Sequence, residues 1–234
     1  PGWQKRRPAP SLRLWRGGLV LGVLLFSGAS LQQIGLIYTT AGKAGFITGL
    51  YIVIVPLLLT LIWRQRVGWM CWLGAALATV GLYLLSAQVG LRPAPGDGWV
   101  LAGAFVWALH VIAVGRLARE ADPLQLAFIQ YITCALLSAL AALLFERNTW
   151  TGVLAAWPGV LYTGIFSIGV GYTVQVMAQR YTPPTHTAII LSMESVFAAL
   201  TGWLILGEVM TPRMITGALL MLTGILAAQK PSAN

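Results

Sequence analysis

The 234-residue chain is 58% hydrophobic and only 9% charged, and its formal net charge is +9. Soluble domains average about 25% charged residues, so water could not solvate the apolar surface of this chain, whereas lipid can. The composition therefore excludes a soluble globular domain. It predicts an all-α integral membrane protein that crosses the bilayer several times.

Eight apolar stretches are each close to the ~20 residues that a helix needs to cross a bilayer. They lie at residues 17–37, 44–63, 68–87, 98–115, 124–145, 158–179, 185–206 and 213–229. The connections are short and most contain Arg, Pro, Asp or Thr, so we expect no domain outside the membrane.

Basic residues are unequally divided between the two sides of the predicted bundle. The side that holds the N-terminus has eleven and the other has four, namely Lys43, Arg92, Arg147 and Arg213. The positive-inside rule then places both termini in the cytoplasm, and we expect a bacterial inner membrane. The eleven are Lys5, Arg6, Arg7, Arg13, Arg16, Arg64, Arg66, Arg116, Arg119, Arg180 and Lys230.

The basic N-terminal flank favours a membrane anchor over nucleic-acid binding. Five of the fifteen cations lie within the first sixteen residues, beside a predicted span and without a folded basic domain around them. We therefore expect the lipid bilayer, and no nucleic acid, as a partner of these charges.

The two cysteines and two histidines predict neither a disulfide nor a metal site. Cys71 is expected near a helix end and Cys134 near the middle of another helix, so a bridge between them is not expected. His110 lies within a predicted span and His186 in a predicted loop, and no ligand-spaced cluster surrounds either. No cofactor is expected.

The sequence matches itself after a shift of 143 residues without a gap. The matching pairs are Gly28 with Gly171, Gln32 with Gln175, Tyr38-Thr39 with Tyr181-Thr182, Val53 with Val196, Leu61 with Leu204, Gly74-Ala75 with Gly217-Ala218, and Gly81 with Gly224. The first three spans thus correspond to the last three. Five spans separate each matched pair, so the two copies have opposite directions in the membrane, which is typical of secondary transporters.

The repeat predicts a partial first copy at residues 1–90, with three helices, and a second copy at residues 91–234, with five. The counterparts of the spans at 98–115 and 124–145 would fall before Pro1. We therefore expect that a parent protein has two further N-terminal helices, and that the eight-helix chain does not transport alone.

Three segments resemble the EamA-type members of the drug/metabolite transporter superfamily, and the resemblance covers nearly the whole chain. They are Tyr38–Tyr51 followed by Pro56, Trp107–His110 with Gly115–Arg119, and Glu194–Leu200 with Leu206–Glu208. The resemblance implies a ten-helix permease for amino acids and other small metabolites, with a central cavity between two five-helix halves. Two positions depart from the pattern: Ser195 stands where Pro often follows the mid-helix Glu, and Gln65-Arg66 where an acidic residue is frequent.

Glu194 is the most informative polar residue because it lies near the centre of a predicted span. A bare carboxylate in hydrocarbon costs several kcal/mol, so it must be neutral, paired or in contact with water. Thr187, Glu194 and Thr201 recur every seven residues, which predicts a polar stripe on one helix face. Glu194 is either a contact for a substrate amine or proton, or a hydrogen bond that joins two helices; both interpretations stay open.

Further candidates for a substrate or coupling site carry amide, aromatic or imidazole groups. Amides bind zwitterionic or hydroxylated solutes but also join helices. An imidazole suits proton coupling, although a packing role for His110 is favoured. Tyr51 occupies the repeat position of Glu194 and is expected opposite it across the cavity. These candidates are Gln32, Tyr51, Trp107, His110, Gln130, Tyr131 and Gln175.

The leading hypothesis is a secondary transporter of small polar metabolites that uses alternating access. A membrane-embedded enzyme is the alternative, but neither His-Glu-x-x-His, Gly-x-Ser-x-Gly nor a phosphate-binding loop occurs, so we expect no enzyme. A scaffold or receptor-like protein is the third hypothesis, but this hypothesis does not explain why the sequence contains an inverted repeat. The residues do not specify the substrate, the coupling ion, the direction of transport or the oligomeric state. Protons are one candidate for the coupling ion.

Overall fold

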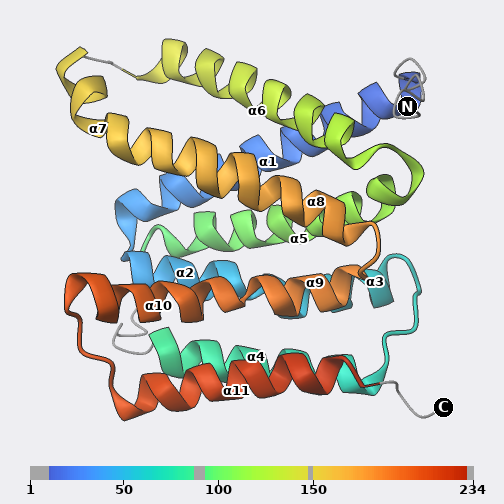
Figure 1. The fold of residues 1–234 in the computed structure, drawn as a ribbon, viewed down its shortest axis with the longest axis vertical. Helices are drawn as coiled ribbons and strands as arrows, with labels where there is room; N and C mark the ends of the chain where they lie inside the picture. Colours follow the sequence, from blue (N-terminus) through green and yellow to red (C-terminus); the bar gives the residue numbers. More distant parts are fainter. Residues whose placement is uncertain (1–10, 87–92, 147–149, 231–234) are drawn as a thin grey trace, which may run out of the picture. The chain divides into compact units, whose positions relative to one another are not determined.

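The computed structural model describes residues 11–86, 93–146 and 150–230, which fold into helices without strands (Figure 1). Within these ranges, seven helices are long and apolar enough to cross a membrane, and Pro212–Ala228 is an apolar helix of shorter length. The predicted all-α membrane fold is confirmed. Lys5, Arg6, Arg7, Arg92 and Arg147, which entered the charge count, lie outside the described residues.

The helices group into two compact units. Unit 1 consists of residues 1–26 and 113–181, and unit 2 of residues 27–112 and 182–234. Unit 1 contains α6 (Pro123–Phe145), α7 (Trp150–Tyr162), the π-helix η1 (Thr163–Tyr172) and α8 (Thr173–Gln179). Unit 2 contains α2 (Ala41–Gly49), α3 (Tyr51–Leu61), α4 (Trp69–Ser86), α9 (Pro184–Leu191), α10 (Met193–Leu206) and α11 (Pro212–Ala228). Two long helices, α1 (Leu12–Tyr38) and α5 (Asp97–Glu120), contribute to both.

Two helices extend beyond the spans predicted for them. The fourth span was predicted to end at residue 115, but α5 continues to Glu120, which pairs with Arg13 at 2.7 Å. The sixth was predicted to begin at residue 158, but α7 begins at Trp150. Hydropathy finds the part of a helix that lipid surrounds, and it does not find where the backbone hydrogen bonds stop.

Proline and a capping side chain start several helices where the sequence suggested turns. Asp122 accepts hydrogen bonds from the backbone N–H groups of Leu124 (2.9 Å) and Gln125 (3.1 Å) ahead of α6. Thr211 caps α11 in the same way. The proline that follows each cap, at the first helical position, has no N–H that would need a partner there.

Two predicted spans, 44–63 and 185–206, are each interrupted near the middle, which the sequence did not predict. The first divides into α2 and α3 at Leu50, and the second into α9 and α10 at Ser192. The 143-residue shift places Ser192 one residue from the equivalent of Leu50, so both copies break at corresponding points. The local contacts differ: Ser192 Oγ donates to the Ile189 carbonyl at 2.6 Å, whereas α3 contains Pro56, which has no N–H to donate to the Ile52 carbonyl.

Helices α4 and α11 lie side by side and antiparallel in unit 2 (Figure 1). A Cβ atom on Gly74 would lie 2.5 Å from the Gly224 carbonyl oxygen, and one on Gly81 would lie 2.5 Å from that of Gly217. The 143-residue shift pairs Gly74 with Gly217 and Gly81 with Gly224. The contact is therefore reciprocal under this shift, which is the pattern expected of two equivalent helices that meet at a two-fold axis.

The core of unit 2 surrounds this crossing. Buried Ala78, Leu82 and Met221 from α4 and α11 contact buried residues of the interrupted helices, among them Ile52, Ile189 and Val196. Both interrupted helices are therefore packed against the α4–α11 pair near their breaks.

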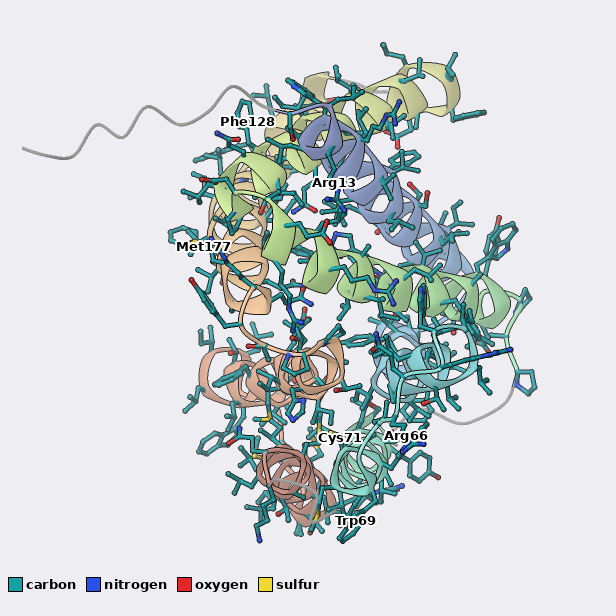
Figure 2. All side chains as sticks on the ribbon, turned by 90° about the vertical axis from the view of Figure 1, so that its right-hand side faces the viewer. Arg13, Arg66, Trp69, Cys71, Phe128 and Met177 are labelled. Atoms are coloured by element: carbon teal, nitrogen blue, oxygen red, sulfur yellow. The ribbon has the colours of Figure 1, made fainter. Side chains whose placement is uncertain are left out.

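Unit 1 packs α1 against α5 and α6 through small residues. A Cβ atom on Gly17 would lie 3.2 Å from Leu117, and one on Gly22 would lie 2.8 Å from the Gln130 carbonyl oxygen. By contrast, the described side chains of α7 and η1 are exposed from Thr151 to Gly171. The exposed apolar side chains of this unit include Phe128 and Met177, labelled in Figure 2. Such faces suit contact with lipid.

The α4–α11 contact predicts that Gly81→Ala destabilises the protein. The added methyl group meets the Gly217 backbone, so the helices must separate, at a cost of about 1–3 kcal/mol. Melting temperature in detergent should fall.

Gly45→Ala is the matched control, because a Cβ atom at Gly45 in α2 has no neighbour within 4 Å. Alanine favours a helix over glycine by about 0.5–1 kcal/mol, so this variant should melt at the parent temperature or slightly above. Equal melting temperatures for the two variants would contradict the proposed close contact.

Candidate functional site

The predicted site residues fall into two groups, one in each unit. Unit 2 contains Gln32, Tyr51, Trp107, His110 and Glu194, and unit 1 contains Gln130, Tyr131 and Gln175.

Gln32, Trp107 and His110 form one contiguous set in unit 2. The indole N–H of Trp107 donates to Gln32 Oε1 at 3.2 Å, and its ring meets the ring of buried His110 edge-on, with centroids 5.9 Å apart. The absence of a side chain at Gly28 makes room for the indole, because a Cβ atom there would lie only 3.1 Å from the Trp107 ring. Gln32 is half-buried, and its amide N–H groups have no partner among the described residues, so they are available to a carbonyl or carboxylate oxygen.

Glu194 lies in the first turn of α10, directly after the break at Ser192. Its side chain is exposed and makes neither a hydrogen bond nor an ion pair with any described residue. A helix N-terminus favours a nearby carboxylate, so the start of α10 gives this acid partial electrostatic compensation, and the Ser195 N–H there donates to the Ser192 carbonyl at 3.1 Å.

The predicted polar stripe of Thr187, Glu194 and Thr201 is wrong. The helix is interrupted between Thr187 and Glu194, which changes the register of the two faces. Thr187 is buried whereas Glu194 and Thr201 are exposed, and each threonine hydroxyl donates to a carbonyl of its own chain segment, Pro183 or Phe197.

Tyr51 is the first residue of α3, so it follows the break in the first copy as Glu194 follows the break in the second. Its ring packs on the unit 2 core, to which Met193 also contributes. The inverted repeat therefore places a phenol and a carboxylate at the N-termini of two half-helices. Such termini bind anionic groups of solutes in transporters with interrupted helices.

The unit 1 candidates are occupied mainly by one another and by their neighbours. Gln130 is completely buried, and the Tyr131 hydroxyl lies 3.0 Å from Thr173 Oγ1. Gln175 Nε2 donates to Gln179 Oε1 at 3.1 Å, and Gln179 is completely buried. These contacts favour a helix-packing role for the amides of this unit.

Sequence reasoning overlooked several polar residues that the structure shows to be engaged. Gln179 was detectable from its spacing of four from Gln175. His186 lies in the first turn of α9 and not in a loop, and its Nε2 is 3.8 Å from Cys71 Sγ. Neither Ser192 nor the contact of Lys43 with Asp97 carries a local sequence signal.

No group of three or more His, Cys, Asp or Glu side chains that could hold a metal ion occurs among the described residues. Both cysteines, Cys71 and Cys134, are free thiols there.

The fold, the repeat and the interrupted helices define a multi-pass membrane protein of transporter architecture. The sequence profile of the EamA-like transporter family matches residues 2–87 and 94–228. The chain belongs to this family, as the resemblance of its motifs indicated.

Known proteins agree with this placement. The chain is 34% identical over 223 residues to a protein of Archaeoglobus fulgidus described as an uncharacterized transporter, an alignment that covers 93% of this chain and 70% of that protein. It is 27% identical over 159 residues to the threonine/homoserine exporter RhtA of Escherichia coli K12, covering 67% of this chain and 52% of the exporter. One solved crystal structure shares the fold with a TM-score of 0.74 and 20% identity, covering 95% of this chain and 88% of the other.

The isolation of Glu194 predicts that Glu194→Gln leaves the melting temperature near that of the parent, since no described hydrogen bond or ion pair is lost. If Glu194 contacts a transported solute or proton, transport should fall about tenfold or more, because losing the charged hydrogen bond between Glu194 and the solute costs on the order of 1.5–3 kcal/mol. Both quantities are to be measured across pH 5.5–8, a range of about two and a half units that covers the ordinary titration of an imidazole.

Ser195→Ala is a suitable control beside Glu194, because it removes a polar group without a charge. Unchanged transport by Glu194→Gln at every pH, together with a lowered melting temperature for Glu194→Leu, would leave only a structural role for this carboxylate.

Proposed function

We propose that this protein is a secondary transporter of small polar metabolites, with amino acids as the first substrate class, and that it works by alternating access. The observation that carries the proposal is the pair of interrupted helices, α2–α3 and α9–α10, which the inverted repeat relates to each other. Two equivalent half-helix pairs of opposite direction supply two equivalent motions, one toward each side of the membrane.

The chemistry of unit 2 suits a zwitterion. A solute carboxylate would be bound by the N-terminal N–H groups of α3 or α10 and by the free amide of Gln32. A solute ammonium group would be bound by the Glu194 carboxylate, which has no described partner to displace. The same carboxylate would suit proton coupling, because a mid-membrane acid that meets water intermittently binds and releases protons.

The relatives direct the choice of substrate. RhtA is named as an exporter of threonine and homoserine, both of which add a hydroxyl group to the amino-acid zwitterion. Export of small hydroxylated amino acids is therefore the first activity to test.

We also propose that both termini are cytoplasmic, on the strength of the eleven-to-four division of cations. Alkaline phosphatase fused to the C-terminus should then be inactive, whereas green fluorescent protein fused there should fluoresce. Active phosphatase at the C-terminus would reverse the orientation.

The function is tested with the natural protein, expressed from its complete gene and reconstituted in proteoliposomes. We expect concentration-dependent flux of labelled threonine or homoserine, and stabilisation of the purified protein by the same solutes, because a ligand that binds the folded state raises its melting temperature. Leucine and glucose serve as comparison solutes.

Flux that saturates for neither amino acids nor other small polar solutes would contradict the proposal. Flux that rises linearly with solute concentration, and that a second solute does not reduce, would indicate a channel in place of a carrier.

A further inference from the structure

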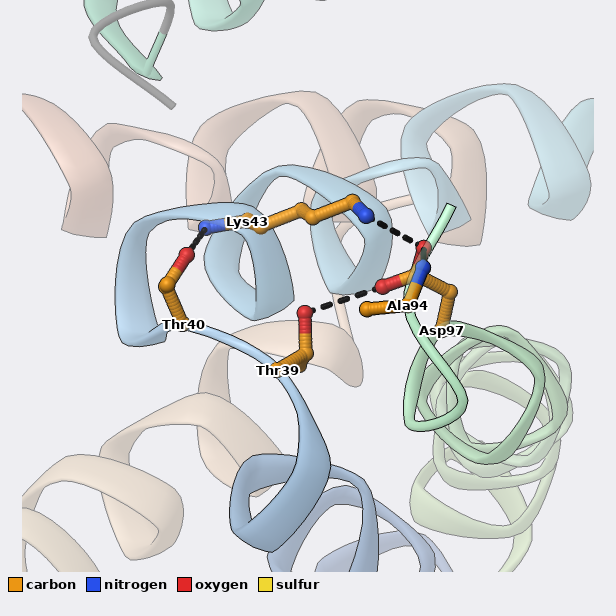
Figure 3. A network of polar contacts seen from close by, with 5 residues as sticks. All are labelled: Thr39, Thr40, Lys43, Ala94 and Asp97. Atoms are coloured by element: carbon orange, nitrogen blue, oxygen red, sulfur yellow. Dashed lines mark hydrogen bonds and ion pairs between the residues drawn. The ribbon is translucent and has the colours of Figure 1, made fainter. Parts of the chain in front are cut away.

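An ion pair between a buried lysine and a half-buried aspartate lies at one end of unit 2, outside the candidate site. Lys43 and Asp97 form the pair, with only 10% of the lysine side chain and 22% of the aspartate side chain exposed. Asp97 also accepts hydrogen bonds from the Thr39 hydroxyl at 2.9 Å and from the Ala94 backbone N–H at 2.8 Å (Figure 3). Both carboxylate oxygens are thereby occupied.

The network joins segments that are distant in sequence. Lys43 is in the first turn of α2, Thr39 is in the connection from α1 to α2, and Asp97 is the first residue of α5. The last turns of α1 also touch α5 directly, since a Cβ atom on Gly35 would clash with Val100 Cγ2 in α5. The ion pair therefore joins the start of α2 to the start of α5, where the end of α1 is also closely packed.

Helix α2 extends from this network to the break at Leu50, a distance of about 13 Å for nine residues. Apart from the polar end, its described contacts with α4 are apolar: Gly49 lies against Leu82, and the rings of Phe46 and Tyr83 meet edge-on at 5.9 Å. It is thus a short rigid segment with a break at one end and an ion pair at the other.

The equivalent helix of the second copy is held differently. The 143-residue shift pairs Lys43 with His186 in the first turn of α9. His186 contacts the Cys71 thiol at 3.8 Å and the Thr185 hydroxyl at 3.3 Å, without a carboxylate among its described contacts. An ammonium–carboxylate pair in an enclosed place is a stronger restraint than an imidazole–thiol contact.

We propose that α2 is a gate helix, that the Lys43–Asp97 ion pair latches its N-terminal end to α5, and that the break at Leu50 is its hinge. The latch opens and closes once in each transport cycle, at the membrane face opposite the termini. The inference rests on the proposed transport function for the cycle, but the latch itself is testable without any substrate.

The first experiment measures access to α2. Thr48 is replaced by cysteine in a Cys71→Ser/Cys134→Ser background, because Thr48 Oγ1 is buried and has no partner among the described residues. A membrane-impermeant methanethiosulfonate is applied to sealed vesicles of each orientation. The double substitution Lys43→Met/Asp97→Asn should raise the labelling rate of the cysteine at position 48 about tenfold or more over the rate with Lys43 and Asp97 present. The increase should occur only when the reagent is applied to the face opposite the termini.

Stability separates the latch from a general loss of structure. Asp97→Asn leaves the buried Lys43 charge without its partner, and Lys43→Met leaves the half-buried Asp97 charge without its partner. Each should lower the melting temperature by about 5 °C or more, whereas the double variant should recover most of that loss. Arg13→Met/Glu120→Gln is the matched control, because it removes an ion pair whose side chains are 77% and 47% exposed. A labelling rate in the double variant within twofold of the control would overturn the latch.

The second experiment tests movement. Thr39→Cys/Asp97→Cys in the Lys43→Met variant is cross-linked by a short bifunctional methanethiosulfonate. Transport should stop on cross-linking and return on reduction, and undiminished transport by the cross-linked protein would overturn the gate. If no solute is transported by the parent, the proposed function fails, while the labelling result still decides the latch.

Discussion

The reciprocal contact between α4 and α11 is the interaction on which unit 2 depends. Lipid is as apolar as the helices, so burial of hydrocarbon gives little drive for their association within a membrane. Close backbone approach supplies the missing attraction, and the Gly74–Gly224 and Gly81–Gly217 contacts bring helix backbones together without side chains between them. Helices α3, α9 and α10 then pack on the pair that results.

The same contact connects sequence symmetry to function. The repeat equivalents of Gly74 and Gly224, which form one contact, are Gly217 and Gly81, which form the other. Around this crossing the copies place corresponding breaks, at Leu50 and Ser192. A break within the membrane is tolerated only where the freed backbone groups find partners or polar surroundings. In the second copy the Ser192 hydroxyl donates a hydrogen bond to the Ile189 carbonyl, and the exposed Glu194 carboxylate lies in the first turn of α10.

Much of the fold follows from the sequence because lipid imposes strict lengths and apolar composition. The all-α class is confirmed, and among the described residues seven of the eight predicted spans are helices long enough to cross a membrane, while the eighth is the shorter apolar helix α11. Matches such as Gly81 with Gly224 suggested the repeat. The helix breaks were not predictable, because Pro56 lies six residues from Leu50 and serine at position 192 is compatible with a continuous helix. The π-helix at Thr163–Tyr172 likewise has no periodicity that distinguishes it from an α-helix over ten residues. Pairings such as Lys43 with Asp97 depend on tertiary contacts that a single sequence does not record.

The central claim is that two inverted copies, joined at the α4–α11 crossing, expose one site alternately to the two sides of the membrane. Its most direct test is the side-specific labelling rate of a cysteine at Leu50 or at its repeat equivalent, Met193, with and without a transported solute. The account predicts that the solute raises labelling from one side and lowers it from the other. Simultaneous labelling from both sides at equal rates, whether or not the solute is bound, would contradict it.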